Sequence, residues 1–257
     1  MTNIIEGYIG KRVDGKKSRV PAKLDFIQSA TGLFLGLFMW GHMFFVATIL
    51  ISEDALNFVA GAFEGGLFLS EKQPLLVSFI VFVVFCIFVV HAALAMRKFP
   101  INFRQYQIYK AHAENMKHSD TTLWFWQANT GFIMFFLGSA HLIIMLTNPA
   151  ITAEISGGRM WGHFMWPFYL ILLFAVEIHG GVGLYRLCVK WGWFEGKDAK
   201  ITRARLTKIK WALTAFFLAL GLLTLAAFIK TGYKYADLNS GVHAEYQINN
   251  DVKAVIS

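Results

Sequence analysis

The sequence predicts an all-α membrane protein, a bundle of five transmembrane helices with a cytoplasmic N-terminus and the C-terminus outside. Composition is the first reason. Of the 257 residues, 56% are hydrophobic and only 16% are charged, whereas a soluble domain carries about 25% charged residues. Charge distribution is the second, because the charged residues come in blocks separated by long uncharged stretches. These two observations exclude an ordinary soluble domain.

Five stretches are long enough to cross a membrane, which takes about 20 mainly apolar residues. They cover residues 26–52, 73–96, 121–153, 160–185 and 211–229. The third stretch is too long for one span, and Pro149 predicts that its helix ends near Leu146. The fourth is interrupted only by Glu177. We therefore expect a cytoplasmic basic N-terminal arm (1–25), a five-helix transmembrane domain (26–230) and a periplasmic tail (231–257).

The basic residues predict the orientation of these helices. Nineteen of the 24 Lys and Arg residues lie before the first span, between the second and third spans, or between the fourth and fifth. These connections share one side of the membrane, and an excess of Lys and Arg marks the cytoplasmic side. The net charge of +8 therefore follows from topology. We expect a lipid bilayer as a partner and no nucleic acid.

The first four spans each contain one histidine: His42, His91, His141 and His179. Ionisable side chains inside a membrane are costly and usually functional. Counted along their helices, His42 and His141 lie roughly 24–27 Å from the cytoplasmic ends, and His91 and His179 only about 10 Å. Two histidines thus share an outer level and two share an inner level. This arrangement predicts two bis-histidine sites stacked across the membrane.

The chemistry of two opposed imidazoles favours haem. Neutral imidazole suits haem iron, zinc or copper, but two histidines alone leave tetrahedral zinc short of ligands. Around haem iron they complete the coordination. Gly138, Gly183 and Ala95 lie one turn from a histidine and leave room for a flat group, although small residues also serve helix packing. The sequence has no Cys-x-x-Cys-His motif, so the haems are expected to be of b type.

Two glutamates occupy unusual positions. Glu177 lies near the middle of the fourth span, where an ionised carboxylate costs at least ~2.5 kcal/mol. It is therefore expected to be protonated, paired or in a wet cavity, and a structural hydrogen bond is the alternative. Glu64 lies in the outer connection between the first two spans, within an apolar stretch. Taken alone, it reads as a solvated loop carboxylate.

Several long segments resemble a known family. They are KLDFIQSATG at 23–32, MRKFPINFRQY at 96–106, FAVEIHG at 174–180 and KWGWF at 190–194. These segments are similar to the dihaem cytochrome b subunit of bacterial menaquinol:fumarate reductase, a membrane anchor of the succinate:quinone oxidoreductase superfamily. The likeness extends over about residues 22–230.

The resemblance implies specific roles for the residues singled out above. It implies that His42 and His141 ligate the iron of an outer, distal haem, and that His91 and His179 ligate that of an inner, proximal haem. It implies four contacts to the proximal haem's propionates, from Gln28, Ser29, Trp124 and Lys190. An outer glutamate of the family, at its menaquinol oxidation site, matches Glu64 and reverses the reading as a loop carboxylate. The mid-membrane glutamate of the family matches Glu177.

The resemblance also implies a function and partners. The expected protein is a multi-pass subunit of the bacterial inner membrane that oxidises menaquinol near the outer face. Two haem b groups pass the electrons to an iron–sulfur subunit, which feeds an FAD-containing flavoprotein subunit that reduces fumarate. The chain itself carries no fumarate chemistry. A dimer of three-subunit complexes is the expected assembly.

In this scheme Glu64 accepts a proton from menaquinol. Glu177 relays a proton inward, because moving an electron inward opposes the membrane potential by about 2.3 kcal/mol per 100 mV.

Three alternatives remain open from the sequence. A cytochrome b subunit of succinate dehydrogenase would use the same residues in the opposite direction. A histidine-lined transporter or proton channel would contain the same intramembrane histidines without haem. A purely structural anchor would keep the electron transfer of its complex after those histidines were removed.

Overall fold

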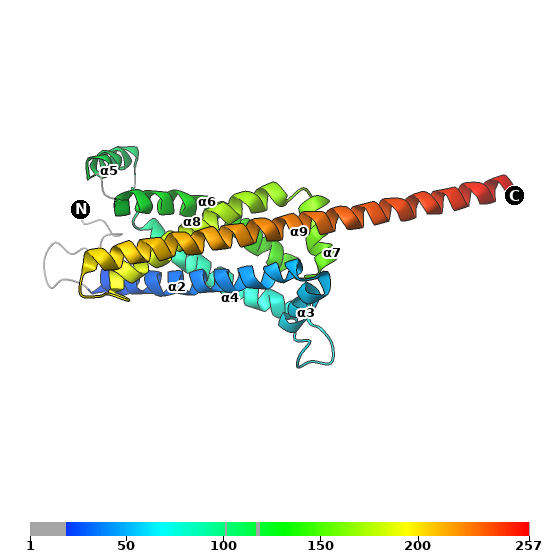
Figure 1. Ribbon diagram of the computed structural model, residues 1–257, viewed down its shortest axis with the longest axis horizontal. Helices are drawn as coiled ribbons and strands as arrows, with labels where there is room; N and C mark the ends of the chain where they lie inside the picture. The colour runs from blue at the N-terminus through cyan, green and yellow to red at the C-terminus, as the bar shows by residue number, and fades with distance from the viewer. Residues whose placement is uncertain (1–18, 101, 117–118, 257) are drawn as a thin grey trace, which may run out of the picture.

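The computed structural model describes residues 19–100, 102–116 and 119–256. All regular elements of this part are helical. They are α2 (Val20–Ala47), the short 3-10 helix η1 (Thr48–Leu50), α3 (Glu53–Phe63), α4 (Pro74–Met96), α5 (Phe103–Met116), α6 (Ser119–Thr147), α7 (Ala153–Trp161), α8 (Trp166–Trp191) and α9 (Ala199–Ile256). The five long helices are α2, α4, α6, α8 and α9. Figure 1 shows them side by side, with the short helices at the two ends of the bundle.

The five long helices confirm the predicted spans and the all-α fold. Each contains a stretch long and apolar enough to cross a membrane: Val20–Leu50, Pro74–Met96, Thr121–Thr147, Trp166–Trp191 and Ala199–Asp237. The chain is a multi-pass membrane protein. The third helix ends at Thr147, next to the position that Pro149 predicted.

Several helices extend beyond the uncharged stretches that predicted them, and the first and the fifth do so by the most residues. The first begins at Val20, inside the expected N-terminal arm, and has a proline in its first turn, where proline is tolerated because its missing N–H has no intrahelical partner. The fifth begins at Ala199 and continues to Ile256, so the expected tail is helical and projects past the other helices (Figure 1). Charge-free length marks the apolar part of a helix, and the backbone hydrogen bonding continues into charged sequence.

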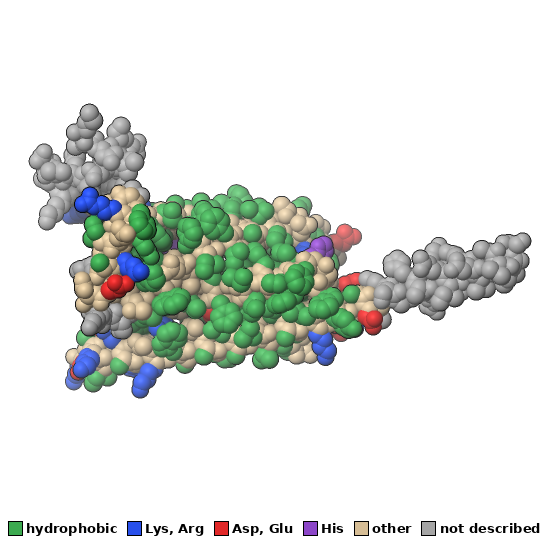
Figure 2. All heavy atoms as spheres, turned by 90° about the horizontal axis from the view of Figure 1, so that it is seen from above, with side chains coloured by type: hydrophobic (Ala, Val, Ile, Leu, Met, Phe, Trp, Pro, Cys, Tyr) green, Lys and Arg blue, Asp and Glu red, His purple; other side chains and the backbone are tan. Residues whose placement is uncertain are grey.

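The surface of the bundle is a wide hydrophobic belt. Large apolar side chains such as Phe34, Phe79 and Phe132 are exposed on the long helices, and Figure 2 shows such side chains covering the flank. Monomeric soluble proteins rarely expose apolar patches of this extent, so acyl chains are the expected solvent of this surface.

Basic side chains gather at one end of the bundle (Figure 2). We call this the basic end. It contains the beginning of α2 and the ends of α4 and α8, with Lys98 following α4 and Lys190 in the last turn of α8. The opposite end, the far end, contains α3 and α7 (Figure 1).

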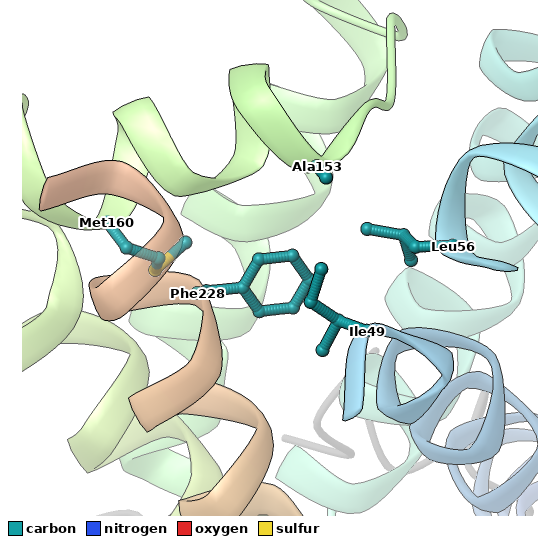
Figure 3. Packing of buried hydrophobic residues seen from close by; sticks show 5 residues of the cluster. All are labelled: Ile49, Leu56, Ala153, Met160 and Phe228. Carbon is teal, nitrogen blue, oxygen red and sulfur yellow. The ribbon is translucent and has the colours of Figure 1, made fainter. Parts of the chain in front are cut away.

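A hydrophobic cluster fixes the far end. It consists of Ile49, Leu56, Ala153, Met160 and Phe228, all buried (Figure 3). These residues come from η1, α3, α7 and α9, so the two short helices are packed onto the long ones. At the crossing of α7 and α9 the backbones approach so closely that a Cβ atom at Gly157 would lie 2.7 Å from the amide nitrogen of Gly232. Leu56 has no exposed surface, and its helix leads directly to Glu64.

Candidate functional site

The structure brings the four intramembrane histidines together as two pairs. His42 of α2 faces His141 of α6 toward the far end, with ring centroids 6.1 Å apart. His91 of α4 faces His179 of α8 toward the basic end, with centroids 6.4 Å apart. These are the two pairs that depth along the helices predicted.

The spacing of each pair suits one iron between two imidazoles. A histidine nitrogen lies about 2 Å from a transition metal that it ligates, and the ring centre lies roughly 1 Å behind that nitrogen, so two coaxial ligands have centroids about 6 Å apart. In the described part of the chain, no three His, Cys, Asp or Glu side chains gather into a metal-binding cluster. Each pair therefore offers two nitrogen ligands, as a haem iron requires.

Hydrogen bonds orient the pair at the basic end. The Nδ1 of His179 donates to the backbone carbonyl oxygen of Gln127 at 2.9 Å. Because a carbonyl oxygen can only accept, this contact places the proton on Nδ1 and leaves the Nε2 lone pair for a metal. The Nδ1 of His91 lies 3.2 Å from the Thr31 hydroxyl. Partners of this kind are typical of the second nitrogen of metal-binding histidines.

The pair at the far end lies among aromatic rings. The His141 Nδ1 is 3.3 Å from the Tyr169 hydroxyl, and the His42 ring stacks on Phe38 and meets Phe45 edge-on. Tyr169 also lines a cavity of about 780 Å³ at the far end, together with residues that include Arg159. The far-end pair thus has an apolar surround with one hydroxyl contact to His141.

A cavity of about 760 Å³ opens beside the pair at the basic end. His91 and His179 both lie on its wall. Two glycines of the neighbouring helices let the rings in: a Cβ atom at Gly32 would lie 2.8 Å from Cε1 of His91, and one at Gly131 would lie 2.8 Å from Cε1 of His179. The wall is therefore cleared of side chains where the two rings stand.

The mouth of this cavity is polar. All four residues expected to contact propionates line the cavity: Gln28, Ser29, Trp124 and Lys190. The Lys190 ammonium donates to the Ser29 hydroxyl at 3.1 Å. The side-chain oxygen of Gln28 is buried and has no hydrogen-bond partner among the described residues, which marks an acceptor that awaits a donor from a ligand or water.

These features fit the implied cofactor. Two imidazoles lie at a spacing that suits one iron between them, the cavity has room beside them, and its cationic mouth can receive carboxylates. Haem b would bring an iron, a flat ring and two carboxylates. The donor set of the basic-end site is therefore compatible with haem b.

Glu177 lies on a different face of α8 from His179. Its side chain is 1% exposed, and its Oε1 has no hydrogen-bond partner in the described structure. One turn before it, Leu173 lies where a Cβ atom at Gly221 of α9 would be, and one turn after it, Gly181 lies against the Thr214 hydroxyl of α9. Glu177 therefore faces α9, whereas His179 faces α6.

Glu64 closes α3 at the far end. It is the C-terminal cap of that helix and is 8% exposed, so it is not the solvated loop carboxylate that its position in the sequence suggested. The ring of the preceding Phe63 lies 5.2 Å from Phe45, and Phe45 lies 6.0 Å from the His42 ring. Two aromatic rings thus connect the segment of Glu64 to the far-end pair.

Sequence reasoning missed several residues of these sites. Lys98 enters the sequence analysis only as one of the basic residues that predict the topology, although it follows the helix that carries His91 and lines the cavity. Tyr169 and Thr31 carried no signal, because their histidine partners belong to other helices. The contact between His179 and Gln127 uses the backbone carbonyl of Gln127, so the residue type at that position does not predict it.

Residues 102–222 match the family model described as succinate dehydrogenase/fumarate reductase transmembrane subunit. The chain is 55% identical over 242 residues to the fumarate reductase cytochrome b subunit of Wolinella succinogenes, covering 93% of this chain and 94% of that protein. It is 54% identical over 235 residues to the protein of the same name from Helicobacter pylori strain J99, covering 91% of each chain.

Proposed function

Because the chain belongs to the family of fumarate reductase cytochrome b subunits, we propose that it oxidises menaquinol at its far end and passes electrons to the soluble part of the complex at its basic end. Four parts of this proposal rest on described residues: the two histidine pairs, the orientation of the bundle, Glu64 and Glu177.

The two histidine pairs hold two b haems in this proposal. Bound there, the haems supply one-electron transfer from the far-end site to the basic-end site and on to an iron–sulfur subunit. His42 and His141 would hold the haem iron at the far end, and His91 and His179 would hold it at the basic end. Gln28, Ser29, Trp124 and Lys190 hold the propionates at the basic end. The observation that carries the proposal is the 6.1 and 6.4 Å spacing of the two pairs.

The basic end faces the cytoplasm, in accordance with the excess of Lys and Arg there. This orientation presents Lys98 and Lys190 on the side where the iron–sulfur and flavoprotein subunits of fumarate reductase would dock. The far end, with α3 and α7, then faces the periplasm of a bacterial inner membrane. A dimer of three-subunit complexes remains the proposed assembly.

Glu64 is the proposed acceptor of a menaquinol proton. Its burial at the end of α3 separates it from bulk water. The aromatic contacts through Phe63 and Phe45 place its segment next to the His42 environment. A quinol oxidised there would release its protons at the far end, which is also the end where its electrons would enter the chain.

Glu177 is the proposed relay that carries a proton inward with each electron. It is nearly completely buried, in a span where an isolated carboxylate charge costs at least ~2.5 kcal/mol. Its Oε1 has no hydrogen-bond partner among the described residues, so this oxygen is available to take up a proton. A proton that accompanies the electron cancels the electrical work, which is about 2.3 kcal/mol per charge per 100 mV.

The proposal is tested with the complex of this chain and its soluble subunits in vesicles. The single variants His42→Ala and His91→Ala should each abolish menaquinol-driven fumarate reduction and leave viologen-driven fumarate reduction intact, because the viologen feeds the soluble subunits directly. His163→Ala, at an exposed histidine, is the matched control. Quinol-driven turnover that survives both pair variants would refute the electron path and favour a structural anchor.

A further inference from the structure

Charged side chains from three parts of the chain meet at the mouth of the basic-end cavity: Asp25 of α2, Lys98 just after α4, and Lys190 of α8. The Asp25 carboxylate of α2 lies 2.9 Å from the Lys98 ammonium. Its other oxygen lies 3.6 Å from the Lys190 ammonium of α8. One aspartate therefore bridges two lysines that are far apart in the sequence.

Both lysines follow the basic-end histidines in the direction of the mouth. Lys190 lies eleven residues after His179, about three turns further along α8, and Lys98 lies two residues after the end of α4, the helix that carries His91. Both lysines line the cavity. Asp25 precedes Gly32 by seven residues, and Gly32 lies against the His91 ring.

The charges at this mouth do not balance. The described lining of the cavity contains three cationic side chains, Lys98, Arg186 and Lys190, and no Asp or Glu. Asp25 stands outside that lining, next to the lysines. The side chains of Lys98 and Asp25 are 43% and 37% exposed, and ion pairs with such exposure contribute little free energy. The lysines can therefore turn to another carboxylate at small cost.

We propose that Lys98 is a second cationic contact for the carboxylates of the haem at the basic end, additional to Lys190, and that Asp25 positions both lysines. The inference rests on the proposed haem site and adds two residues to it. A ligand with two carboxylates at an apolar cavity is stabilised by a cation for each of them. Asp25 occupies the middle position between the lysines and holds both ammonium groups at the mouth.

The arrangement has an electrostatic consequence for the iron. A positive charge nearby stabilises the reduced state, which carries one more electron, and the effect is stronger at low dielectric than in water. Loss of Lys98 should therefore lower the midpoint potential of the basic-end haem, and loss of the Asp25 charge should raise it. The far-end haem should be unchanged in both cases.

The test is a redox titration of the purified complex that resolves the two haems, combined with haem counted per polypeptide. Lys98→Met and Lys190→Met should both shift the basic-end haem to a lower potential, and Asp25→Asn should shift it to a higher one. Lys98→Arg, which keeps the charge, should retain the haem at nearly the wild-type potential. Lys110→Met is the matched control, since this lysine of α5 is 56% exposed and pairs with Glu114.

The outcomes separate this inference from the function on which it rests. A shift in Lys190→Met, with Lys98→Met no different from Lys110→Met, would overturn the role of Lys98 and leave the haem site standing. No shift in either lysine variant would overturn the inference, whereas a wild-type complex without a basic-end haem would overturn the proposed function as well. Loss of the basic-end haem in Lys98→Arg as well as in Lys98→Met would show a packing role and also overturn the inference.

Discussion

The two histidine pairs share a spacing and differ in their surroundings. The pair at the basic end, His91 and His179, opens onto a cavity with glycine walls and a cationic mouth. The pair at the far end, His42 and His141, lies among the rings of Phe38, Phe45 and Tyr169. One pair of histidines thus borders a cavity with a cationic mouth, and the other is packed against aromatic rings. We therefore expect charge at the mouth to affect the midpoint potential of a haem at the basic end, and ring packing and one hydroxyl to affect a haem at the far end.

The largest effect is expected where glycine makes room for a ring. Gly131→Ala places a Cβ atom 2.8 Å from Cε1 of His179, so the ring must move from the ligating position. We expect the variant to lose most of the basic-end haem and to retain the far-end haem, as measured by haem per polypeptide. Gly158→Ala is the control, because a Cβ atom there meets nothing within 4 Å. Equal loss of both haems would contradict the expectation that the two sites bind haem independently.

A second effect is expected on quinol-driven turnover, from the buried Glu177 between the two ends of the bundle. Glu177→Gln removes the acid without changing the size of the side chain, and we expect menaquinol-driven fumarate reduction to fall at least about ten-fold, since each 1.4 kcal/mol of added work is a factor of ten. Haem content and viologen-driven fumarate reduction should remain normal. Glu154→Gln, at an exposed glutamate of α7, should behave like wild type. Normal quinol-driven turnover in Glu177→Gln would remove the relay from the proposed function.

Sequence patterns predicted the large-scale arrangement and the histidine pairs. Uncharged length predicted the five spans because lipid excludes charge over a known thickness. Depth along the helices predicted the pairs because helical rise is constant. The short helices α3 and α7 were not predicted, since they lie outside the uncharged runs, although Ser52 accepts from the Ala55 amide as an N-terminal cap. Lys98 and Asp25 were missed because a contact between three helices depends on their packing.

Two smaller effects on haem retention, one at each site, should follow from removing the hydroxyl partners of the histidines. Tyr169→Phe removes the hydroxyl beside His141, and Thr31→Val removes the hydroxyl beside His91. Loss of such a partner typically costs 10- to 100-fold in metal affinity, by an order-of-magnitude rule. We expect Tyr169→Phe to weaken only the far-end haem and Thr31→Val only the basic-end haem, read from haem retention during detergent washing. A variant that weakens the wrong haem would contradict the pairing of partner and site.

The smallest effect concerns the attachment of α3 to α9 at the far end. The Glu53 carboxylate accepts from the Tyr235 hydroxyl at 2.8 Å and from the Lys234 ammonium at 3.1 Å. The hydrogen bond from Tyr235 is the largest cause that lowers the pKa of Glu53 from 4.5. A lowered pKa means that this stabilisation is complete above pH 4.5 and is lost as the pH falls through the folded-state value.

Glu53→Gln should therefore destabilise the protein by about 0.2–1 kcal/mol at neutral pH, and the difference from wild type should shrink in acid. Thermal unfolding of the detergent-solubilised complex, at neutral pH and at a pH below 4.5, measures this difference in stability. Glu71→Gln, at an exposed glutamate of the same connection, is the control. A difference that grows in acid would contradict the assignment of the effect to the Glu53 carboxylate.

The central claim is that the two histidine pairs hold two b haems in different environments. The most direct test is a dithionite-reduced minus oxidised spectrum of the purified chain from haem-competent cells, with haem counted per polypeptide and both midpoint potentials titrated. Two b-type haems per chain with two separate potentials are expected. A folded, membrane-inserted chain without haem would contradict the claim and favour a histidine-lined transporter.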